Sequence, residues 1–512
     1  MTSGRRRRLV VCAVALLALL VVIIGIVWGS RVAAGSDAYG YVSQADLWLR
    51  GHLYIDQSFF TRVPWPMARW TFVPLGYWPS GYGIVPQYPP GLPLLMAAAK
   101  AMAGQCAMFW IVPLCGGALV VATYVMARRL GQDHAALGAA WIVATSPTVL
   151  FMTMAPMSDV PAAAAWAAAI ACVLAGTFRS AAAGGVAAAI AILIRPNLVP
   201  LAGVLVLWLG LERRRADAIV FAAVAAAGAI AVAAVNTRLY GSPFRTGYDL
   251  TDGFAVRYVP TNLANYGGWL ISAEPPLAFG VVFLAARSRA RALTLSCAVV
   301  VFSIYLLYVP WDAWWYLRFL LPIWPLAAIA AARTISRLGQ SGRAAKTVAA
   351  VLWLAIGLYG GWQAYRRDTF DAARGEAKYI EVARAVDSIV DPDAVIISAQ
   401  HSGSIRYYAG RLTLRWDVGD AAWLDRTVEW LAANGHHPYF VLEPQEIEQL
   451  RARYARRNAT ARLDWTPMVV FRRGAVTMFD AKRRETTGTP VPQEELKSVG
   501  DCPPQRPFPT LR

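Results

Sequence analysis

The stretch LVVCAVALLALLVVIIGIVWGS (9–30) is followed almost at once by GSDAYGYVSQADLWLRGHLY (35–54). The first stretch is long and apolar enough to cross a bilayer, because about 20 apolar residues span the ~30 Å hydrocarbon core. The second stretch is rich in aromatic residues and carries Asp37 near its start. Charged residues at a membrane edge are costly and are usually kept for function. The pair of stretches therefore predicts a transmembrane helix that leads into a functional segment, with Asp37 as the first candidate residue.

The composition extends this prediction to the whole chain. Of its 512 residues, 57% are hydrophobic and only 16% are charged, and apolar runs of membrane length recur along it. This is the composition of an integral membrane protein. Hydropathy predicts about eleven spans, at roughly 9–30, 107–127, 135–153, 159–177, 181–194, 198–211, 217–236, 267–286, 292–310, 319–336 and 345–364. The expected fold is mainly α, a polytopic transmembrane helical bundle.

The placement of cations predicts the orientation of the bundle. Arg5–Arg8 resemble the start of a signal peptide, but the apolar run that follows is too long for one, which favours a retained span. Arg and Lys gather in alternate short loops, beginning with this N-terminal cluster. By the positive-inside rule the N-terminus is cytoplasmic, and an odd number of spans places the C-terminus outside. The net charge of +18 then reflects topology, and no motif for nucleic-acid binding is present.

Three regions are predicted along the chain. Residues 1–365 form the transmembrane domain, with a long first external loop at 31–106 whose apolar stretch 88–104 lies in the membrane interface. Residues 366–483 have a soluble composition and form a small α/β domain, with strands at 394–399, 439–443 and 476–480 and a helix at 443–457. Residues 484–512 are expected to be a disordered tail.

The cysteines and histidines give no sign of a bound group. Of the six cysteines, five lie in or beside apolar spans and Cys502 stands alone in the tail, so no disulfide framework or metal-ligand spacing is visible. The sequence contains no P-loop, dinucleotide-binding fingerprint, GxSxG elbow or HExxH motif, which disfavours soluble nucleotide chemistry.

Charged residues near the predicted outer face are the candidates for chemistry, and each has a simpler alternative role. Asp37 or Asp159 could cap a helix, since Ser158 and Pro161 beside Asp159 are typical of a helix start. Arg195 and Arg318 could extend to lipid headgroups. Lys100 is expected to extend to the interface, with a phosphate contact as the alternative.

Taken together, these motifs resemble the GT-C class of membrane glycosyltransferases, in particular the protein-mannosyltransferase and aminoarabinose-transferase-like group (family 39/83 type). The resemblance covers about residues 9–365. It is carried by Asp37, Tyr41, Ala45 and Gly51 in the first loop, and by YPPGLPLL (88–95), APMSDVP (155–161), IRPN (194–197) and LRFLLPIWP (317–325).

The resemblance implies an inverting transferase that moves a sugar from a polyprenyl-phosphate donor to an acceptor hydroxyl. It makes Asp37 the catalytic base and gives substrate-binding roles to Tyr41, Lys100, Asp159, Arg195 and Arg318. Many members of the group have a second acid after the first-loop Asp, where this chain has Ala38. The use of a metal is therefore unknown, with a divalent ion at Asp159 as one option, and no other cofactor is indicated.

The partners that follow are a polyprenyl-phosphate-linked sugar, membrane lipids and an acceptor that is a protein, a glycan or a lipid. The expected location is a bacterial inner membrane, with the C-terminal domain in the periplasm. The main alternative is a transporter or flippase of lipid-linked sugars. Against it, the sequence shows no inverted repeat and no paired broken helices. A scaffold that displays the C-terminal domain is a third option, which leaves the acidic first loop unexplained.

Overall fold

The computed structural model describes residues 3–81, 83–248, 253–284, 290–418, 422–485, 488–493 and 502–509. The chain divides into two compact units. Unit 1 comprises residues 1–29, 89–95 and 109–372, and unit 2 comprises residues 30–88, 96–108 and 373–512. These units are defined by contacts and the predicted domains by composition, so they are different divisions of the chain.

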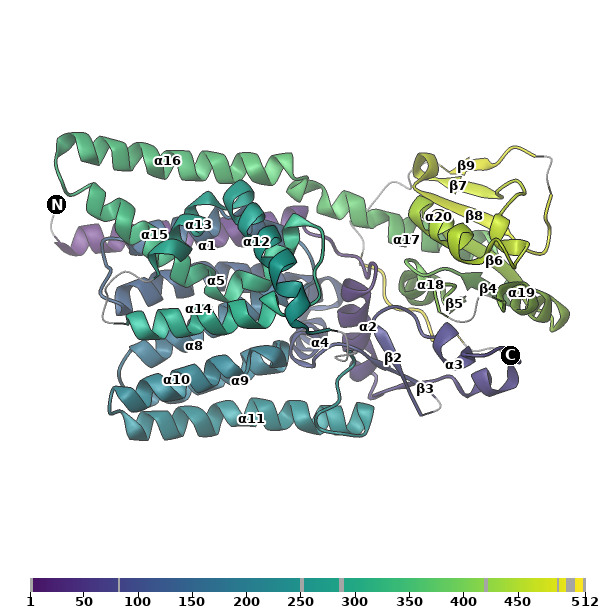
Figure 1. Cartoon of the computed structure of the whole chain (residues 1–512), viewed down its shortest axis with the longest axis horizontal. Helices are drawn as coiled ribbons and strands as arrows, with labels where there is room; N and C mark the ends of the chain where they lie inside the picture. Colours follow the sequence, from purple (N-terminus) through teal and green to yellow (C-terminus); the bar gives the residue numbers. More distant parts are fainter. Residues whose placement is uncertain are drawn as a thin grey trace. The chain divides into compact units, whose positions relative to one another are not determined.

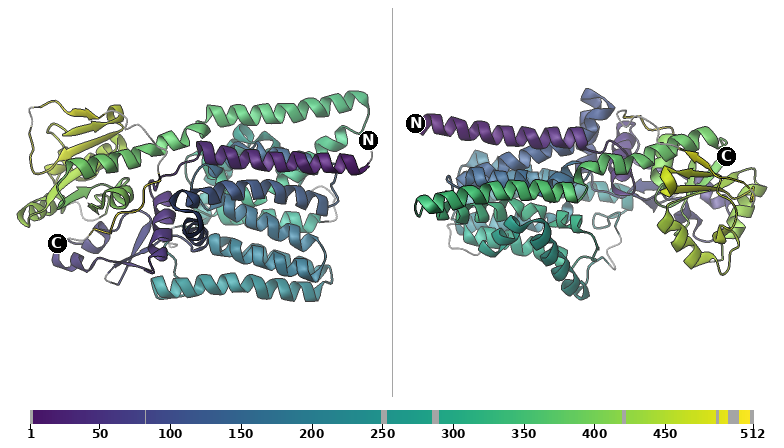
Figure 2. Two further views of the ribbon diagram at one scale, coloured as in Figure 1. Left: turned by 180° about the vertical axis from the view of Figure 1, so that it is seen from behind. Right: turned by 90° about the horizontal axis from the view of Figure 1, so that it is seen from above.

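Unit 1 is a bundle of apolar helices. Helices α8, α9 and α11 pack side by side, as Figures 1 and 2 show in teal. The helices of this unit are α1 (Ser3–Trp28), α5 (Ile111–Arg129), α6 (Ala136–Ala144), α7 (Pro147–Thr153), α8 (Asp159–Leu174), α9 (Phe178–Ile194), α10 (Pro200–Leu211), α11 (Arg215–Tyr240), α12 (Val259–Ala273), α13 (Pro275–Phe283), α14 (Arg291–Leu306), α15 (Trp324–Leu338) and α16 (Arg343–Arg366), with short 3₁₀ helices η3 (Pro196–Leu198) and η5 (Trp314–Ile323).

Every predicted span coincides with one or more of these helices, so the mainly helical architecture is confirmed. Among the described residues, five helices are each long and apolar enough to cross a membrane, and six spans result if the bent pair α6 and α7 counts as one. The chain is therefore an integral membrane protein. The number of eleven spans stays a prediction, because several of the apolar helices have only 10–17 residues.

Two of the predicted spans are broken, which corrects the expectation of unbroken helices. Helices α6 and α7 meet at a bend of 58°. Helix α12 ends at Ala273 and α13 begins at Pro275, with Glu274 between them. Proline at the start of α7 and α13 explains both breaks, because proline cannot donate the backbone hydrogen bond that would continue the helix. The absence of broken helices therefore no longer counts against a transporter.

Unit 2 combines the first loop with the C-terminal segment. The loop contains α2 (Asp37–Leu49), α3 (Ala68–Thr71) and a small antiparallel sheet of β1 (Ile55–Asp56), β3 (Gly83–Pro86) and β2 (Tyr77–Ser80) in that order. The predicted interfacial helix is observed as α4 (Gly91–Ala103), whose residues are divided between the two units.

The C-terminal segment forms a six-stranded sheet in the order β5-β4-β6-β8-β7-β9. Strand β4 pairs in parallel with both β5 and β6, and β6 pairs antiparallel with β8. The predicted strands and helix are confirmed as β4, β6, β8 and α20. The elements are α17 (Ala372–Ile389), β4 (Ala394–Ile397), α18 (Ser402–Ala409), β5 (Leu412–Leu414), α19 (Leu424–Ala433), β6 (His437–Leu442), α20 (Pro444–Tyr454), β7 (Val469–Phe471), β8 (Val476–Asp480) and β9 (Val491–Gln493).

One hydrophobic core joins the first loop to this sheet. Loop side chains such as Phe59, Trp65 and Phe72 pack in the same cluster as Ile397 and Leu414 from the sheet strands. Burying each large apolar side chain contributes roughly 1.5–3 kcal/mol. The first loop is therefore part of the folding unit of the C-terminal segment.

The C-terminal tail differs from its prediction as a disordered segment. Within the predicted tail, β9 pairs in parallel with β7, Gln505 is buried, and Cys106 forms a disulfide with Cys502. The expectation that Cys502 stands alone is therefore wrong. The two cysteines are 396 residues apart, so their spacing carried no signal. Residues 486–487, 494–501 and 510–512 of the tail lie outside the described residues.

Candidate functional site

A helical hairpin in unit 1 brings Asp159 and Arg195 together. Asp159 is the first residue of α8, and Arg195 follows the last residue of α9. The two helices have 16 and 17 residues, so the antiparallel hairpin places the start of α8 beside the end of α9. Arg195 Nη2 lies 2.9 Å from Asp159 Oδ1, and the Asp159 side chain is only 1% exposed. Asp159 therefore forms a buried ion pair, and the neighbouring N-cap residue, Ser158, makes no side-chain capping bond.

A second guanidinium faces the same carboxylate oxygen. Arg318 Nε lies 3.9 Å from Asp159 Oδ1, and the Arg318 side chain is 12% exposed. Arg318 belongs to η5, which packs against α8. Two full positive charges thus share one negative charge in a largely buried place. Guanidinium groups gathered in this way offer planar, charged donors, which suit an anionic ligand.

Aromatic rings hold both guanidinium groups. The ring centroid of Phe319 lies 5.4 Å from Arg195 Cζ and 5.2 Å from Arg318 Cζ. Tyr316 adds a second ring 4.9 Å from Arg318 Cζ. Cation–π contacts of this kind each contribute roughly 0.5–2 kcal/mol and orient the planar guanidinium. The rings let two like charges lie near one another.

Tyr305 of α14 completes the cluster. Its hydroxyl accepts hydrogen bonds from Arg195 Nη1 at 3.3 Å and from Asn197 Nδ2 at 2.9 Å. Its ring stacks on Phe319 with centroids 4.8 Å apart and an interplanar angle of 4°. We call Asp159, Arg195, Tyr305, Arg318 and Phe319 the guanidinium cluster. It joins α8, α9, α14 and η5, so the motifs IRPN and LRFLLPIWP meet at one place in unit 1.

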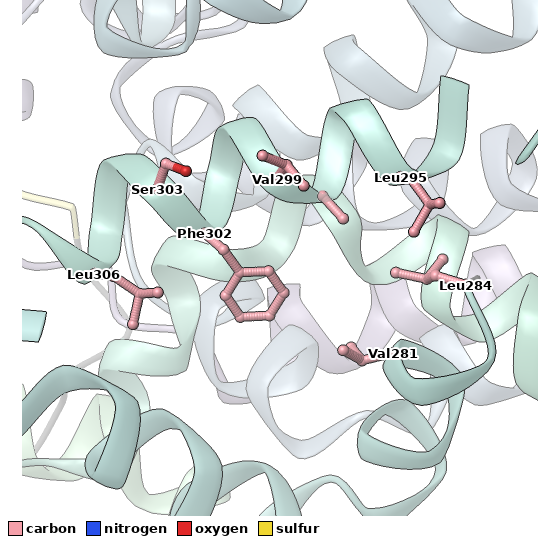
Figure 3. A pocket seen from close by; sticks show the side chains of 8 residues that line it. Val281, Leu284, Leu295, Val299, Phe302, Ser303 and Leu306 are labelled. Atoms are coloured by element: carbon pink, nitrogen blue, oxygen red, sulfur yellow. The ribbon is translucent and has the colours of Figure 1, made fainter. Parts of the chain in front are cut away.

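An apolar hollow of about 300 Å³ lies on the same helix as Tyr305 (Figure 3). Its lining residues from α14 recur every three or four positions, so they share one face of that helix. The lining consists of Val281, Leu284, Leu295, Ala298, Val299, Phe302, Ser303 and Leu306. The hollow therefore lies between α13 and α14, and of its lining residues only Leu306 follows Tyr305 along α14.

Asp37 belongs to unit 2, at the first turn of α2. Its Oδ1 accepts a hydrogen bond from the hydroxyl of Tyr88 at 2.5 Å, and that hydroxyl also lies 2.9 Å from Ser36 Oγ. Tyr41 packs its ring 4.5 Å from the ring of Tyr88. A side chain at Gly40 would place its Cβ 2.1 Å from the Tyr88 ring, so this approach requires glycine. The carboxylate is partly exposed and has a fixed hydrogen-bond partner.

Lys100 has a different kind of environment. Its ammonium forms an ion pair with Asp46, whose other oxygen accepts a hydrogen bond from the Tyr407 hydroxyl at 2.6 Å. Gln105 Nε2 donates to the same hydroxyl at 3.0 Å. These four residues tie α2, α4 and α18 together within unit 2. The structure thus gives Lys100 a bracing contact, and its predicted phosphate contact stays a prediction.

Sequence reasoning missed Glu274, which is buried and links the two helix breaks of unit 1. Its Oε1 accepts hydrogen bonds from Ser146 Oγ at 2.6 Å and from the backbone N–H of Thr148 at 2.8 Å. The carboxylate thereby satisfies donors at the start of α7, as a helix cap does. The signal in the sequence is a single acid followed by two prolines inside an otherwise apolar run.

No metal site accompanies these residues in the part of the chain that the structure describes. No group of three or more His, Cys, Asp or Glu side chains is placed to hold a metal ion there. At Asp159 the two nearby guanidinium groups oppose a divalent cation. The residues at this position do not fit a metal.

The fold has known counterparts among solved structures. ArnT from Cupriavidus metallidurans in the apo state matches with a TM-score of 0.59 and 15% identity over 93% of this chain and 98% of that chain. The same protein bound to undecaprenyl phosphate gives 0.56 and 14% over 91% and 97%. The archaeal oligosaccharyltransferase AglB from Archaeoglobus fulgidus, in complex with an inhibitory peptide and a dolichol-phosphate, gives 0.59 and 11% over 90% and 72%.

No protein-family model matches the sequence, and no curated protein matches it. At such low identities the likeness establishes the fold alone. The chain has the GT-C fold of ArnT and AglB.

Proposed function

We propose that the protein is an inverting glycosyltransferase that moves a sugar from a polyprenyl phosphate to an acceptor hydroxyl on the periplasmic side of the membrane. The observation that carries the proposal is the guanidinium cluster, where two arginines share one carboxylate, and α14 contributes both to this cluster and to the lining of an apolar hollow. Such a place suits a ligand with an anionic head and an apolar tail. The fold supports the proposal, since ArnT was solved with undecaprenyl phosphate and AglB with a dolichol-phosphate.

In the proposed complex, Arg195 and Arg318 bind the phosphate of the donor. A planar guanidinium offers paired donors that match phosphate oxygens, so the two arginines both orient and neutralise the head group. The hollow between α13 and α14 takes the first part of the lipid chain. Asp159 holds the two arginines together before the donor arrives, and Tyr41 and Lys100 remain candidates for contacts to the donor or acceptor.

The reaction is a single displacement at the anomeric carbon. Asp37 accepts the proton of the acceptor hydroxyl while the acceptor oxygen forms a bond to that carbon. The bond from the carbon to the phosphate oxygen breaks, and its electron pair leaves with the lipid phosphate. The phosphate is a weak base, so it leaves without a general acid, and the positive charge of the arginines stabilises it. Attack from the opposite side inverts the anomeric configuration.

The disulfide supports the proposed location. Disulfides persist in oxidising compartments such as the bacterial periplasm and are rare in the cytosol. Cys106 and Cys502 both belong to unit 2, which also contains Asp37. A periplasmic unit 2 agrees with the orientation inferred from the positive-inside rule.

The substitution Asp37→Asn tests the catalytic role. In lipid nanodiscs that contain a polyprenyl-phosphate sugar and candidate acceptors, we expect turnover to fall at least about 100-fold, because the amide cannot accept the proton. The matched control is Asp56→Asn, which alters an exposed carboxylate of the same loop and should keep wild-type turnover. Unchanged turnover in Asp37→Asn would remove Asp37 from the mechanism.

The same preparation separates the transferase from a flippase. A flippase moves the intact donor between leaflets and leaves the bond between sugar and phosphate uncleaved. A transferase releases polyprenyl phosphate in proportion to the product. Mass spectrometry of envelope glycoconjugates from a deletion strain would then identify the sugar and the acceptor together.

A further inference from the structure

Helix α18 is a polar helix with no exposed residue. Its sequence is SGSIRYYA, and all eight residues are buried. Buried polar groups require hydrogen-bond partners, because leaving one unsatisfied costs stability. The partners of α18 lie largely in the first loop of unit 2, which contains Asp37.

Three positions of α18 contact the segment around Asp37. The hydroxyl of Tyr408 accepts a hydrogen bond from the backbone N–H of Ala33 at 2.7 Å, just before α2 begins. Gly403 faces the ring of Tyr39, and a Cβ at Gly403 would lie 2.3 Å from Tyr39 Cδ1. Tyr407 donates to Asp46 further along α2. The helix therefore holds the chain both before and after Asp37.

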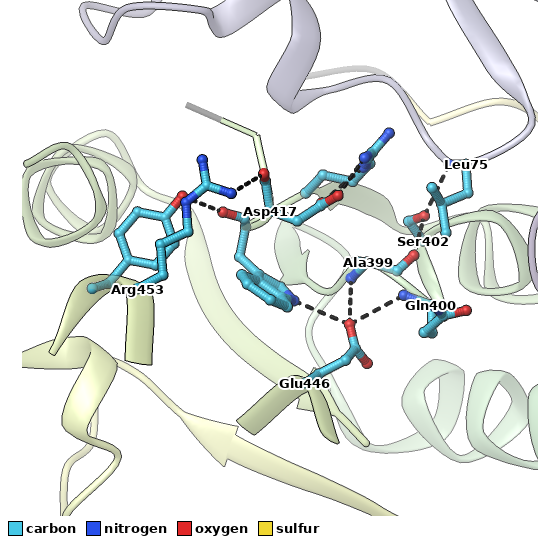
Figure 4. A network of polar contacts seen from close by, with 10 residues as sticks. Leu75, Ala399, Gln400, Ser402, Asp417, Glu446 and Arg453 are labelled. Atoms are coloured by element: carbon cyan, nitrogen blue, oxygen red, sulfur yellow. Dashed lines mark hydrogen bonds and ion pairs between the residues drawn. The ribbon is translucent and has the colours of Figure 1, made fainter. Parts of the chain in front are cut away.

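Two further positions of α18 hold the later part of the loop. Arg406 Nη2 donates to the carbonyl oxygen of Phe72 at 2.6 Å, and its Nε donates to Thr413 Oγ1 at 2.6 Å. Ser402 Oγ accepts a hydrogen bond from the backbone N–H of Leu75 at 3.2 Å (Figure 4). Burial lowers the pKa of Arg406 to about 10, which still leaves the guanidinium charged at neutral pH. The loop is thus attached to α18 along the whole length of the helix.

Glu446 of α20 fixes the chain that leads into α18. Its Oε1 accepts hydrogen bonds from the backbone N–H groups of Ala399 at 3.0 Å and Gln400 at 3.2 Å, and from Trp416 Nε1 at 3.0 Å (Figure 4). Ala399 and Gln400 follow the carboxyl end of β4, and Trp416 follows the carboxyl end of its parallel neighbour β5. Open α/β sheets commonly bind ligands at such carboxyl ends. Here the carboxylate of Glu446, rather than a ligand, accepts the hydrogen bonds of these donors.

We propose that α18 is the element that positions Asp37, with Tyr408 as a positioning residue through its hydrogen bond to Ala33. The C-terminal segment then acts as a support for the first loop. The hydrogen-bond donors at the carboxyl ends of its parallel strands are bonded to Glu446 of the protein itself. The effect on turnover rests on the proposed function. The effect on the local structure of the first loop does not.

The test is amide hydrogen–deuterium exchange of the peptide that covers residues 33–41, measured for the full-length protein in nanodiscs. The variant Tyr408→Phe keeps the ring and removes the acceptor for Ala33 N–H. We expect exchange in this peptide to rise about fivefold, as expected for the loss of one buried hydrogen bond. The control is Tyr439→Phe, since the Tyr439 ring stacks on His437 within the sheet, and it should leave the peptide unchanged.

Turnover provides a second measurement. We expect Tyr408→Phe to lower kcat about fivefold with little change in the donor KM, because the base is displaced while the guanidinium cluster is untouched. If Tyr408→Phe does not yield folded protein, Gly403→Ala takes its place, because its methyl group would displace Tyr39.

The outcomes are distinguishable from those for the proposed function. Faster exchange in residues 33–41 supports the positioning role even if the wild-type protein transfers no sugar. Unchanged exchange in both Tyr408→Phe and Gly403→Ala would overturn it. Equal increases in the Tyr439→Phe control would also overturn it, because they would indicate general loosening of unit 2.

Discussion

Two buried carboxylates, one in each unit, differ in the cations that lie around them. Asp159 in unit 1 and Asp46 in unit 2 are each 1% exposed, and each pairs with a cation. Asp46 forms an ion pair with the Lys100 ammonium and accepts a hydrogen bond from the Tyr407 hydroxyl. Asp159 meets two guanidinium groups, which aromatic rings hold in place.

This difference in surroundings distinguishes an ion pair that braces the structure from one that belongs to a binding site. A matched pair with its hydrogen bonds satisfied leaves no charge for a ligand, and it contributes to the structure by linking elements. Two guanidinium groups gathered around one carboxylate concentrate the planar, charged donors that an anion such as phosphate requires. By this criterion, the contacts of Lys100 are those of a brace, and Arg195 and Arg318 are the residues that we propose for the binding site.

The largest effect is expected from Asp46→Ala. This change leaves the Lys100 ammonium and the Tyr407 hydroxyl without their shared partner inside unit 2. Removing one member of a buried ion pair commonly costs 3–5 kcal/mol, and the partial exposure of Lys100 places the expected loss near the lower end, at about 3 kcal/mol. Thermal unfolding in detergent should show a clear decrease in Tm. A raised donor KM with unchanged Tm would mean that Asp46 and Lys100 belong to the binding site.

A smaller effect is expected from Arg318→Lys. Lysine keeps the charge near Asp159 but loses the planar group that lies against Phe319 and Tyr316. We expect the donor KM to rise about tenfold, which corresponds to about 1.4 kcal/mol. Steady-state kinetics with varied lipid-linked sugar measures this change. A donor KM equal to that of the wild type would show that charge alone is sufficient, contrary to the role given to the rings.

The smallest effect concerns Glu376, a carboxylate of α17 in unit 2. Burial, with a further contribution from Glu443, raises the pKa of Glu376 to about 7, against the opposing effect of Lys378. An acid whose pKa is higher in the folded state than the usual 4.5 favours folding below pH 4.5, and this contribution is lost as the pH rises through 7. Glu376→Gln should therefore raise Tm by roughly 2 °C at pH 8 and leave it unchanged at pH 4.

Differential scanning fluorimetry at the two pH values measures the effect. An equal shift at both would show that ionisation of Glu376 does not matter. The neighbouring Glu443 is a useful reference, because burial would raise its pKa but hydrogen bonds from His401 and Lys378 hold the pKa at about 2. The contribution of the Glu443 carboxylate to stability is present above pH 4.5 and decreases toward pH 2, so it is constant above pH 4.5.

The sequence predicts the helices well because burial in a membrane leaves a long apolar pattern. The proximity of Asp159 and Arg195 can be predicted from the same pattern, since two helices of similar length joined by a short turn bring their outer ends together. The pairing of Asp159 with Arg318 is harder to predict, because it depends on how η5 packs against α8. The resemblance to known motifs identified both arginines as candidates, but it did not predict their positions around Asp159.

Other features leave little trace in the sequence. The disulfide joins residues 396 positions apart, and the ordered tail depends on partners such as β7 and Tyr407. The bracing role of Lys100 requires Asp46 and Tyr407 to meet, which composition does not reveal. In the sequence, prolines are the only sign of the two helix breaks, and Glu274 lies inside a run that hydropathy treats as a single span.

The most direct test of the guanidinium cluster is the binding of undecaprenyl phosphate to the protein in nanodiscs. The double variant Arg195→Ala/Arg318→Ala is compared with Arg128→Ala/Arg214→Ala, which removes two arginines from other ion pairs of unit 1. We predict that the first variant binds at least about 100-fold more weakly than the wild type, since it loses two charged hydrogen-bonding groups, and that the control binds normally. Equal affinity in the two double variants would contradict the assignment of the phosphate site.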